Sequence, residues 1–86
     1  MDTKAKVTDQ PVLTHIQELV KEEHHLYEQG ERGAGGDTDR QRLATVQVEL
    51  DQCWDLLRQR RALRGVGLDP DLAQVRSAQV VEKYEQ

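Results

Sequence analysis

Two stretches of the chain carry hydrophobic side chains at the spacing of an amphipathic helix. In the first stretch, the apolar residues fall within one arc of about 140° when each residue turns the helix by about 100°. These residues are Val12, Leu13, Ile16, Leu19, Val20, Leu26 and Tyr27. Thr8 or Asp9 can cap this helix. The pattern predicts a helix over about residues 9–29, preceded by a disordered tail at residues 1–8.

The second stretch repeats apolar residues at alternating spacings of three and four, which is a heptad pattern. Its residues are Leu43, Val46, Leu50, Cys53 and Leu57, with Trp54 on their flank. An acidic cluster, Asp37 to Asp39, can cap the helix start, and Gly65 and Gly67 can end the helix. We therefore predict a helix over about residues 39–64. The glycine-rich segment 30–36 would connect the two helices as a flexible loop.

For the remaining residues, 65–86, we predict a tail with weak structure. Asp69 and Pro70 mark a turn or the first residue of a helix. Ser77 can cap a short helix over about residues 78–84. That helix would carry Val80, Val81 and Tyr84. Because no stretch predicts a strand, the fold class is all-α: an antiparallel two-helix hairpin with a C-terminal tail or a short third helix.

The composition limits how much core a single chain can form. The chain has 86 residues, is 36% hydrophobic and contains no Phe and one Trp. Small domains of this kind usually need a staple or a partner, and the single Cys53 cannot form an internal disulfide. We predict a homodimer that forms a four-helix bundle with a coiled-coil seam. A monomer with a folded-back tail is the alternative. The predicted interface residues are Leu43, Val46, Leu50, Cys53, Trp54 and Leu57.

Two charged residues occupy apolar positions of the helical patterns. Glu23 lies within the first stripe, and Arg61 lies close to Leu50 on the second. A buried charge is costly unless it is paired. Within one hairpin the two residues are ~25 Å apart along the axis, but they would meet between two copies whose loops point in opposite directions. We predict an inter-chain charge pair that fixes the register; the alternative is that both side chains reach solvent at the bundle ends.

The candidate chemistry is weak. Within “EEHH”, residues 22–25, Glu22 and His25 have the spacing of di-iron bundle ligands, but both face away from the apolar stripe. We therefore predict no metal and no cofactor. Cys53 has no neighbouring base, which indicates a small buried hydrophobic residue and not a nucleophile. We expect no catalytic residues and no enzymatic activity.

Charge and hydropathy restrict the partners and the location. The net charge of −4 gives the chain no basic footprint for nucleic acid. The exception is Arg58–Arg64, which we interpret as cations at a helix C-terminus, with weak nucleic-acid association as the alternative. The polar first ten residues predict no secretory signal, and no stretch approaches the ~18 apolar residues of a membrane span. With one cysteine, the chain is expected to be cytoplasmic and to have no membrane partner.

Two segments resemble a known family. Val20, Glu22, Glu23, His24 and Leu26 form a “VxEEHxL” segment, and Glu49 to Ala62 read “ELDQCWDLLRQRRA”. On these segments the chain is similar, over nearly its whole length, to the small actinobacterial proteins of the domain-of-unknown-function family numbered twenty-six thirty. The glycine-rich connector differs from the more charged connectors of that family. The resemblance implies a small stand-alone cytoplasmic protein with no assigned activity.

Taken with the helical patterns, this leads us to expect an uncharacterised cytoplasmic protein that acts as a structural or protein-interaction module. We expect it to form a homodimer and to bind a further, unidentified protein.

Overall fold

The computed structural model describes residues 8–85, and describes side chains as far as Glu82. The elements are α1 (Gln10–Glu31), α2 (Asp37–Gly65), the short 3-10 helix η2 (Pro70–Leu72) and α3 (Ala78–Glu85). No strand occurs within residues 8–85. The predicted all-α fold, with its antiparallel hairpin and short third helix, is confirmed. The disordered tail expected at residues 1–8 lies outside the described residues, apart from Thr8.

The starts of the two long helices differ in detail from the expected caps. The hydroxyl of Thr8 accepts a hydrogen bond from the Gln10 amide at 3.1 Å. Asp9 makes no capping bond, because its carboxylate is bound by α2 instead. At α2 the cap is Gly36, and Asp37 already lies in the first helical turn, where its negative charge favours the positive helix end.

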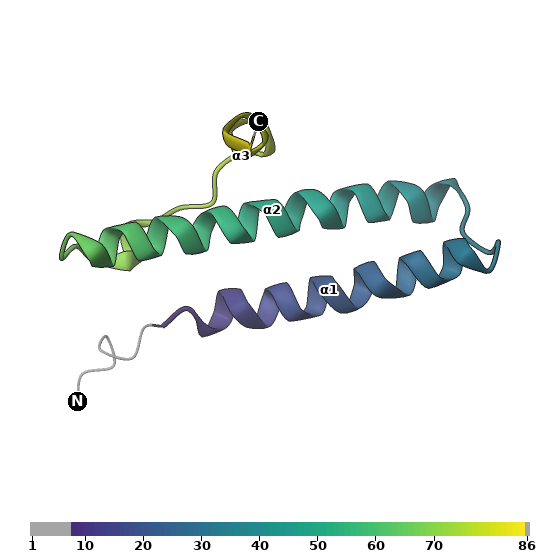
Figure 1. Ribbon diagram of the computed structural model, residues 1–86, viewed down its shortest axis with the longest axis horizontal. Coiled ribbons are helices and arrows are strands. Elements are labelled where there is room, and N and C mark those ends of the chain that lie inside the picture. The colour runs from purple at the N-terminus through teal and green to yellow at the C-terminus, as the bar shows by residue number, and fades with distance from the viewer. Residues whose placement is uncertain (1–7, 86) are drawn as a thin grey trace.

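Backbone hydrogen bonds close the loop between α1 and α2. The amides of Ala34 and Gly35 both donate to the carbonyl oxygen of Gln29, at 2.9 and 3.1 Å. Gly33 has a φ of +75°, in the left-handed region where a side chain is strained. This tight reversal sets α1 and α2 side by side and antiparallel (Figure 1).

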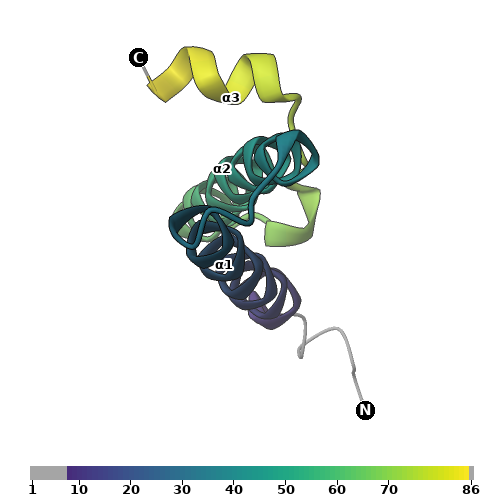
Figure 2. The ribbon, with the colours of Figure 1, turned by 90° about the vertical axis from the view of Figure 1, so that its right-hand side faces the viewer.

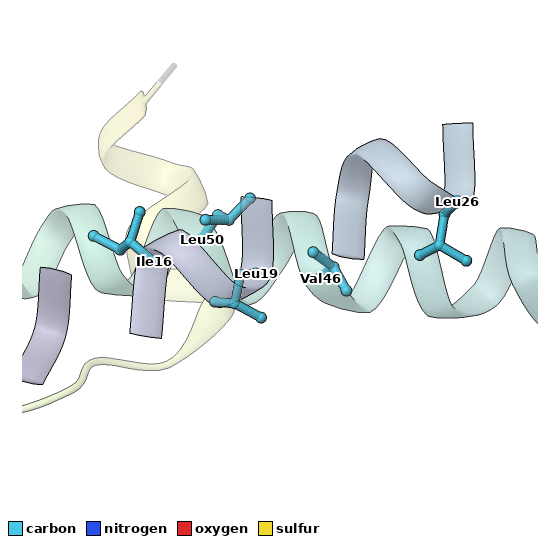
Figure 3. Packing of buried hydrophobic residues seen from close by; sticks show 5 residues of the cluster. All are labelled: Ile16, Leu19, Leu26, Val46 and Leu50. Carbon is cyan, nitrogen blue, oxygen red and sulfur yellow. The ribbon is translucent and has the colours of Figure 1, made fainter. Parts of the chain in front are cut away.

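A row of apolar side chains fills the contact between α1 and α2 (Figure 3). The buried members are Ile16, Leu19 and Leu26 from α1, and Val46 and Leu50 from α2. Partly buried residues surround them: Val12, Val20, Leu43, Cys53 and Leu57. Val46 and Leu50 were assigned to an inter-chain interface, and the structure places them in the core of a single hairpin, where α1 covers them. The predicted interface as a whole stays a prediction.

The third helix lies on the opposite side of α2 from α1 and runs across it (Figures 1 and 2). Within residues 8–85, α2 contacts α1, η2 and α3, whereas α1 and α3 do not touch. Val81, which is 1% exposed, anchors α3. Ser77 caps the start of α3, as expected: its hydroxyl accepts a hydrogen bond from the Val80 amide at 3.3 Å. The side chain of Tyr84 lies outside the described part of the chain.

The arrangement is a single layer of helices and not a bundle. The molecule measures 51 × 32 × 15 Å, so its thickness is close to that of one helix with its side chains. A layer of this kind leaves both broad sides of the hairpin open to solvent. Large apolar side chains of the hairpin remain exposed as a result: Leu13, Tyr27 and Trp54. The segment after α2 also exposes Val66, Leu68, Leu72, Val75 and Val80.

Candidate functional site

Three polar residues of α2 form one row on the side away from α1, and we call Gln52, Asp55 and Gln59 the polar row. Their spacing of three and four places them on one helix face. Asp55 is the most buried of them, at 2% exposed. Arg76 donates to both of its carboxylate oxygens, with Nε at 2.9 Å from Oδ2 and Nη2 on Oδ1. Such a two-point pairing is the strongest form of arginine–carboxylate contact.

The rest of the polar row binds the backbone of residues 73–77, which we call the strap. The side-chain amide of Gln59 donates to the Gln74 carbonyl at 2.8 Å, and its oxygen accepts from the Gln74 amide at 3.4 Å. The side chain of Gln52 donates to the Arg76 carbonyl at 3.1 Å. The hydrogen bonds from Arg76 lower the pKa of Asp55 and outweigh the opposing effect of burial. The segment expected to have weak structure is therefore tied closely to α2.

Arg60 joins three separate parts of the chain at the open end of the hairpin. Its guanidinium is held by Asp9 at 2.6 Å and by Asp71 at 2.9 Å. It also donates to the backbone oxygens of Thr8 at 3.2 Å and Pro70 at 3.3 Å. These contacts satisfy a side chain that is only 6% exposed. The start of α1 and the η2 turn are thereby both fixed to the end of α2.

The neighbouring arginines occupy different environments. Arg64 donates to Asp9, and the two arginines Arg60 and Arg64 together lower the pKa of that carboxyl. The sequence analysis placed Arg61 close to Leu50 on the seam; within the hairpin Arg61 is exposed and Arg60 is the buried one. The reason is that the partner carboxylates lie on the flank of α2 that carries Arg60. Glu23 is half-buried, and its predicted inter-chain pairing with Arg61 stays a prediction.

The structure gives Glu22 a role that the sequence analysis missed. Its two carboxylate oxygens accept from Arg42 of α2, at 2.5 and 2.8 Å, and this bond lowers the pKa of Glu22. His24 and His25 are exposed. Across residues 8–85, no three potential ligands of the His, Cys, Asp or Glu type come together. The cross-helix pair left no signal in the sequence, because Glu22 and Arg42 meet only once the loop sets the register.

One broad side of the hairpin carries two heptad rows, which we call the aromatic face. The row on α1 is Leu13, Val20 and Tyr27, and the row on α2 is Gln47, Trp54 and Arg61. The hydroxyl of Tyr27 accepts from the Gln47 side chain at 2.8 Å, so both rows lie on the same side. Leu13, Tyr27 and Trp54 are 38%, 49% and 44% exposed. The predicted position of Trp54 on the flank of the seam places it here.

Cys53 is half-buried on the other side of the hairpin, in a pocket of about 200 Å³. The pocket is lined by His15, Glu49, Gln52, Cys53, Leu56 and Val75. Burial, assisted by the charge of Glu49, raises the pKa of the Cys53 thiol. The thiol therefore stays protonated at neutral pH, which makes it a poor nucleophile.

None of the helices within residues 8–85 combines the length and apolar character that crossing a membrane requires.

Known proteins resemble this chain over most of its length. Uncharacterized proteins of Mycobacterium bovis and Mycobacterium tuberculosis are 51% identical to this chain over 80 residues, which covers 92% of this chain and 92% of each relative. No solved structure matches the chain. Residues 8–86, which include every helix described above, match the profile of the family described as “Protein of unknown function (DUF2630)”. The chain therefore belongs to the DUF2630 family.

Proposed function

We propose that this protein is a small helical interaction module that acts as a homodimer in the cytoplasm and has no catalytic activity. The observation that carries the proposal is the aromatic face, where Leu13, Tyr27 and Trp54 stay partly exposed on a hairpin one layer thick. Several large apolar side chains exposed on one side of a small protein favour a binding surface, and aromatic side chains are enriched at the centres of interfaces. A single cysteine, Cys53, fits a reducing compartment.

The charges on this face favour a second copy as the partner. The contact of Glu22 with Arg42 and that of Asp9 with Arg60 set the register of the hairpin. In this register Glu23 is level with about residue 45 of α2, which is ~24 Å from Arg61 along the helix. The midpoint of that span falls next to Trp54. A two-fold axis there brings each Glu23 level with the Arg61 of the other copy, which is the symmetry of a closed dimer.

Nucleic-acid association through Arg58–Arg64 has less support. Arg60 and Arg64 are already held by carboxylates, chiefly that of Asp9. Phosphate groups would have to displace these partners, and the chain as a whole carries a charge of −4. Binding to nucleic acid would also fall steeply with salt, whereas association through apolar side chains would not.

Light scattering at micromolar concentrations tests the homodimer. We expect the wild-type chain to have about twice the mass of one 9.9 kDa chain. Trp54→Ala should shift the protein to the monomer, because it removes the centre of the face. Leu72→Ala is the control, since Leu72 is also a large exposed apolar side chain but lies on η2. A wild-type mass of one chain at every concentration would overturn the homodimer.

Exchanging the two charges tests the arrangement within the dimer. Glu23→Arg and Arg61→Glu should each weaken the dimer about tenfold, because each change places like charges opposite one another. The double variant carrying both changes should regain the wild-type affinity, since it restores opposite charges at both contacts. If the double variant does not regain the wild-type affinity, the predicted charge pair is wrong, but the predicted dimer is not affected.

A further inference from the structure

We propose that the polar row of α2 is a binding site for an extended, arginine-bearing segment of a partner protein. The strap of this chain occupies the site in cis. The polar row lies on the side of α2 away from α1, apart from the aromatic face. This inference therefore extends the proposed interaction function to a second surface and does not require the homodimer.

The two glutamines of the polar row bind backbone atoms of the strap. Gln59 binds both the amide and the carbonyl of Gln74, and Gln52 binds the carbonyl of Arg76. Any extended segment without proline at these positions offers the same atoms. Recognition through the main chain, with side-chain pockets adding specificity, is a general way of binding extended peptides. The identity of Gln74 is therefore unimportant, and an extended backbone is what the site requires.

The one side chain of the strap that the polar row selects is arginine. Asp55 is 2% exposed, and a carboxylate at that depth is costly without a cation. The planar guanidinium of Arg76 reaches both oxygens at once, and Gln59 supplies a further hydrogen bond to Oδ2 at 2.9 Å. A lysine would offer a single ammonium and could not pair with both oxygens in the same geometry. The site therefore favours arginine over lysine.

The strap is held in a way that allows it to leave. Every large apolar side chain between residues 66 and 80 is exposed, so hydrogen bonds and the Val81 anchor hold this segment. None of the residues in the α1–α2 core comes from the strap. Segments with few buried apolar contacts open locally while the rest of a protein stays folded. A partner segment can then bind the vacated polar row.

The test measures binding of a fluorescently labelled synthetic peptide with the sequence of residues 70–86. The protein is the full chain carrying Arg76→Ala, which loosens the strap and leaves the polar row intact. Binding in cis acts like a competitor at ~mM effective concentration. We therefore expect this variant to bind the peptide at least tenfold more tightly than the wild-type chain, as followed by fluorescence anisotropy.

Two matched changes test the chemistry. A peptide with lysine in place of arginine at position 76 should bind at least tenfold more weakly. Adding Asp55→Asn to the Arg76→Ala chain should abolish binding. The proposal is overturned if the Arg76→Ala chain keeps its wild-type helical circular dichroism but binds the peptide no better than the wild type.

A second measurement covers the case in which Arg76→Ala does not fold. Unlabelled peptide is added to the isotope-labelled wild-type chain, and displacement of the strap should shift the amide signals of residues 74–76. No shift at millimolar peptide would overturn the proposal. Light scattering of Trp54→Ala, which lacks the proposed dimer face, identifies a different occupant. A mass that still doubles, and does so only with Asp55 present, would assign the site to the strap of a second copy and overturn the assignment to a partner protein.

Discussion

The two sides of α2 are held by different physical interactions. Toward α1, Val46 and Leu50 pack among buried apolar side chains. Toward the strap, Asp55 and Gln59 make directional hydrogen bonds. Apolar burial contributes in proportion to area and tolerates small shifts, whereas a hydrogen bond contributes little net stability but requires defined geometry. We infer that the α1 side supplies most of the stability and the strap side fixes the position of the C-terminal segment.

The largest expected loss of stability comes from a substitution on the α1 side of α2. Leu50→Ala should lower the free energy of unfolding by about 2–5 kcal/mol, because it leaves a cavity in the packed core between α1 and α2. Urea denaturation followed by circular dichroism measures the change. Leu72→Ala removes a leucine that is 62% exposed and should cost no more than about 0.5 kcal/mol. Equal costs for the two variants would contradict the assignment of stability to the α1 side.

Breaking the strap side should cost less. Asp55→Ala should lower the free energy of unfolding by about 1–3 kcal/mol, because it leaves the donors of Gln59 and Arg76 short of an acceptor. The loss is limited because the Arg76 side chain is 37% exposed and water can hydrate it. Glu18→Ala is the control, since its contact with His15 within α1 is exposed and should contribute almost nothing. A cost for Asp55→Ala as small as that of the control would contradict the ordering role of the strap contacts.

A smaller effect concerns the turn that starts the C-terminal segment. Gly67 has a φ of +78°, and a methyl group added there would meet no atom within 4 Å. Gly67→Ala should therefore cost about 1 kcal/mol through backbone strain alone. Gly30 lies within α1 and also has open space around it. Gly30→Ala should stabilise the protein by up to about 1 kcal/mol, so opposite signs are expected in thermal unfolding of the two variants.

The smallest expected difference is between two pH profiles. Asp9 and Asp55 both have a pKa below the ordinary value of 3.8, so the unfolded chain binds more protons than the folded chain in acid. Their contribution to stability is present above that value and is lost as the pH falls through the folded pKa values. Urea denaturation should show the free energy of unfolding falling below about pH 4. Asp9→Asn should flatten that fall, and an unchanged profile would show that Asp9 contributes nothing to it.

The sequence predicted the contact of α2 with α1, because that contact depends on helical periodicity. The spacing of Leu43, Val46 and Leu50 indicates which face of α2 packs against α1, because apolar burial repeats with each helical turn. The strap contacts have no such signature. Gln52 and Arg76 lie 24 residues apart, and Asp55 and Arg76 lie 21 apart. In a helical pattern Gln52 and Asp55 resemble ordinary solvent-facing residues, so their contacts could not be read from the sequence.

The arginine cluster shows a second limit of sequence reasoning. Counting about 100° per residue from Leu50 places Arg61 nearest the core, yet Arg60 is the buried side chain. The count locates a side chain on its own helix but does not show where other segments supply carboxylates. Asp9 and Asp71 come from either end of the chain and decide the outcome. Trp54 was predicted on the flank of the seam and in the interface; it is exposed in the hairpin, and the interface stays a prediction.

Arg60 also sets an order of events during synthesis. Its partner Asp9 lies 51 residues earlier, and its partner Asp71 lies 11 residues later. A chain growing on the ribosome thus presents the apolar stripe of α1 before Val46 and Leu50 exist to cover it. The open end of the hairpin can form its first ion pair, between Arg60 and Asp9, when Arg60 emerges. The second, between Arg60 and Asp71, can form only after Asp71 has followed.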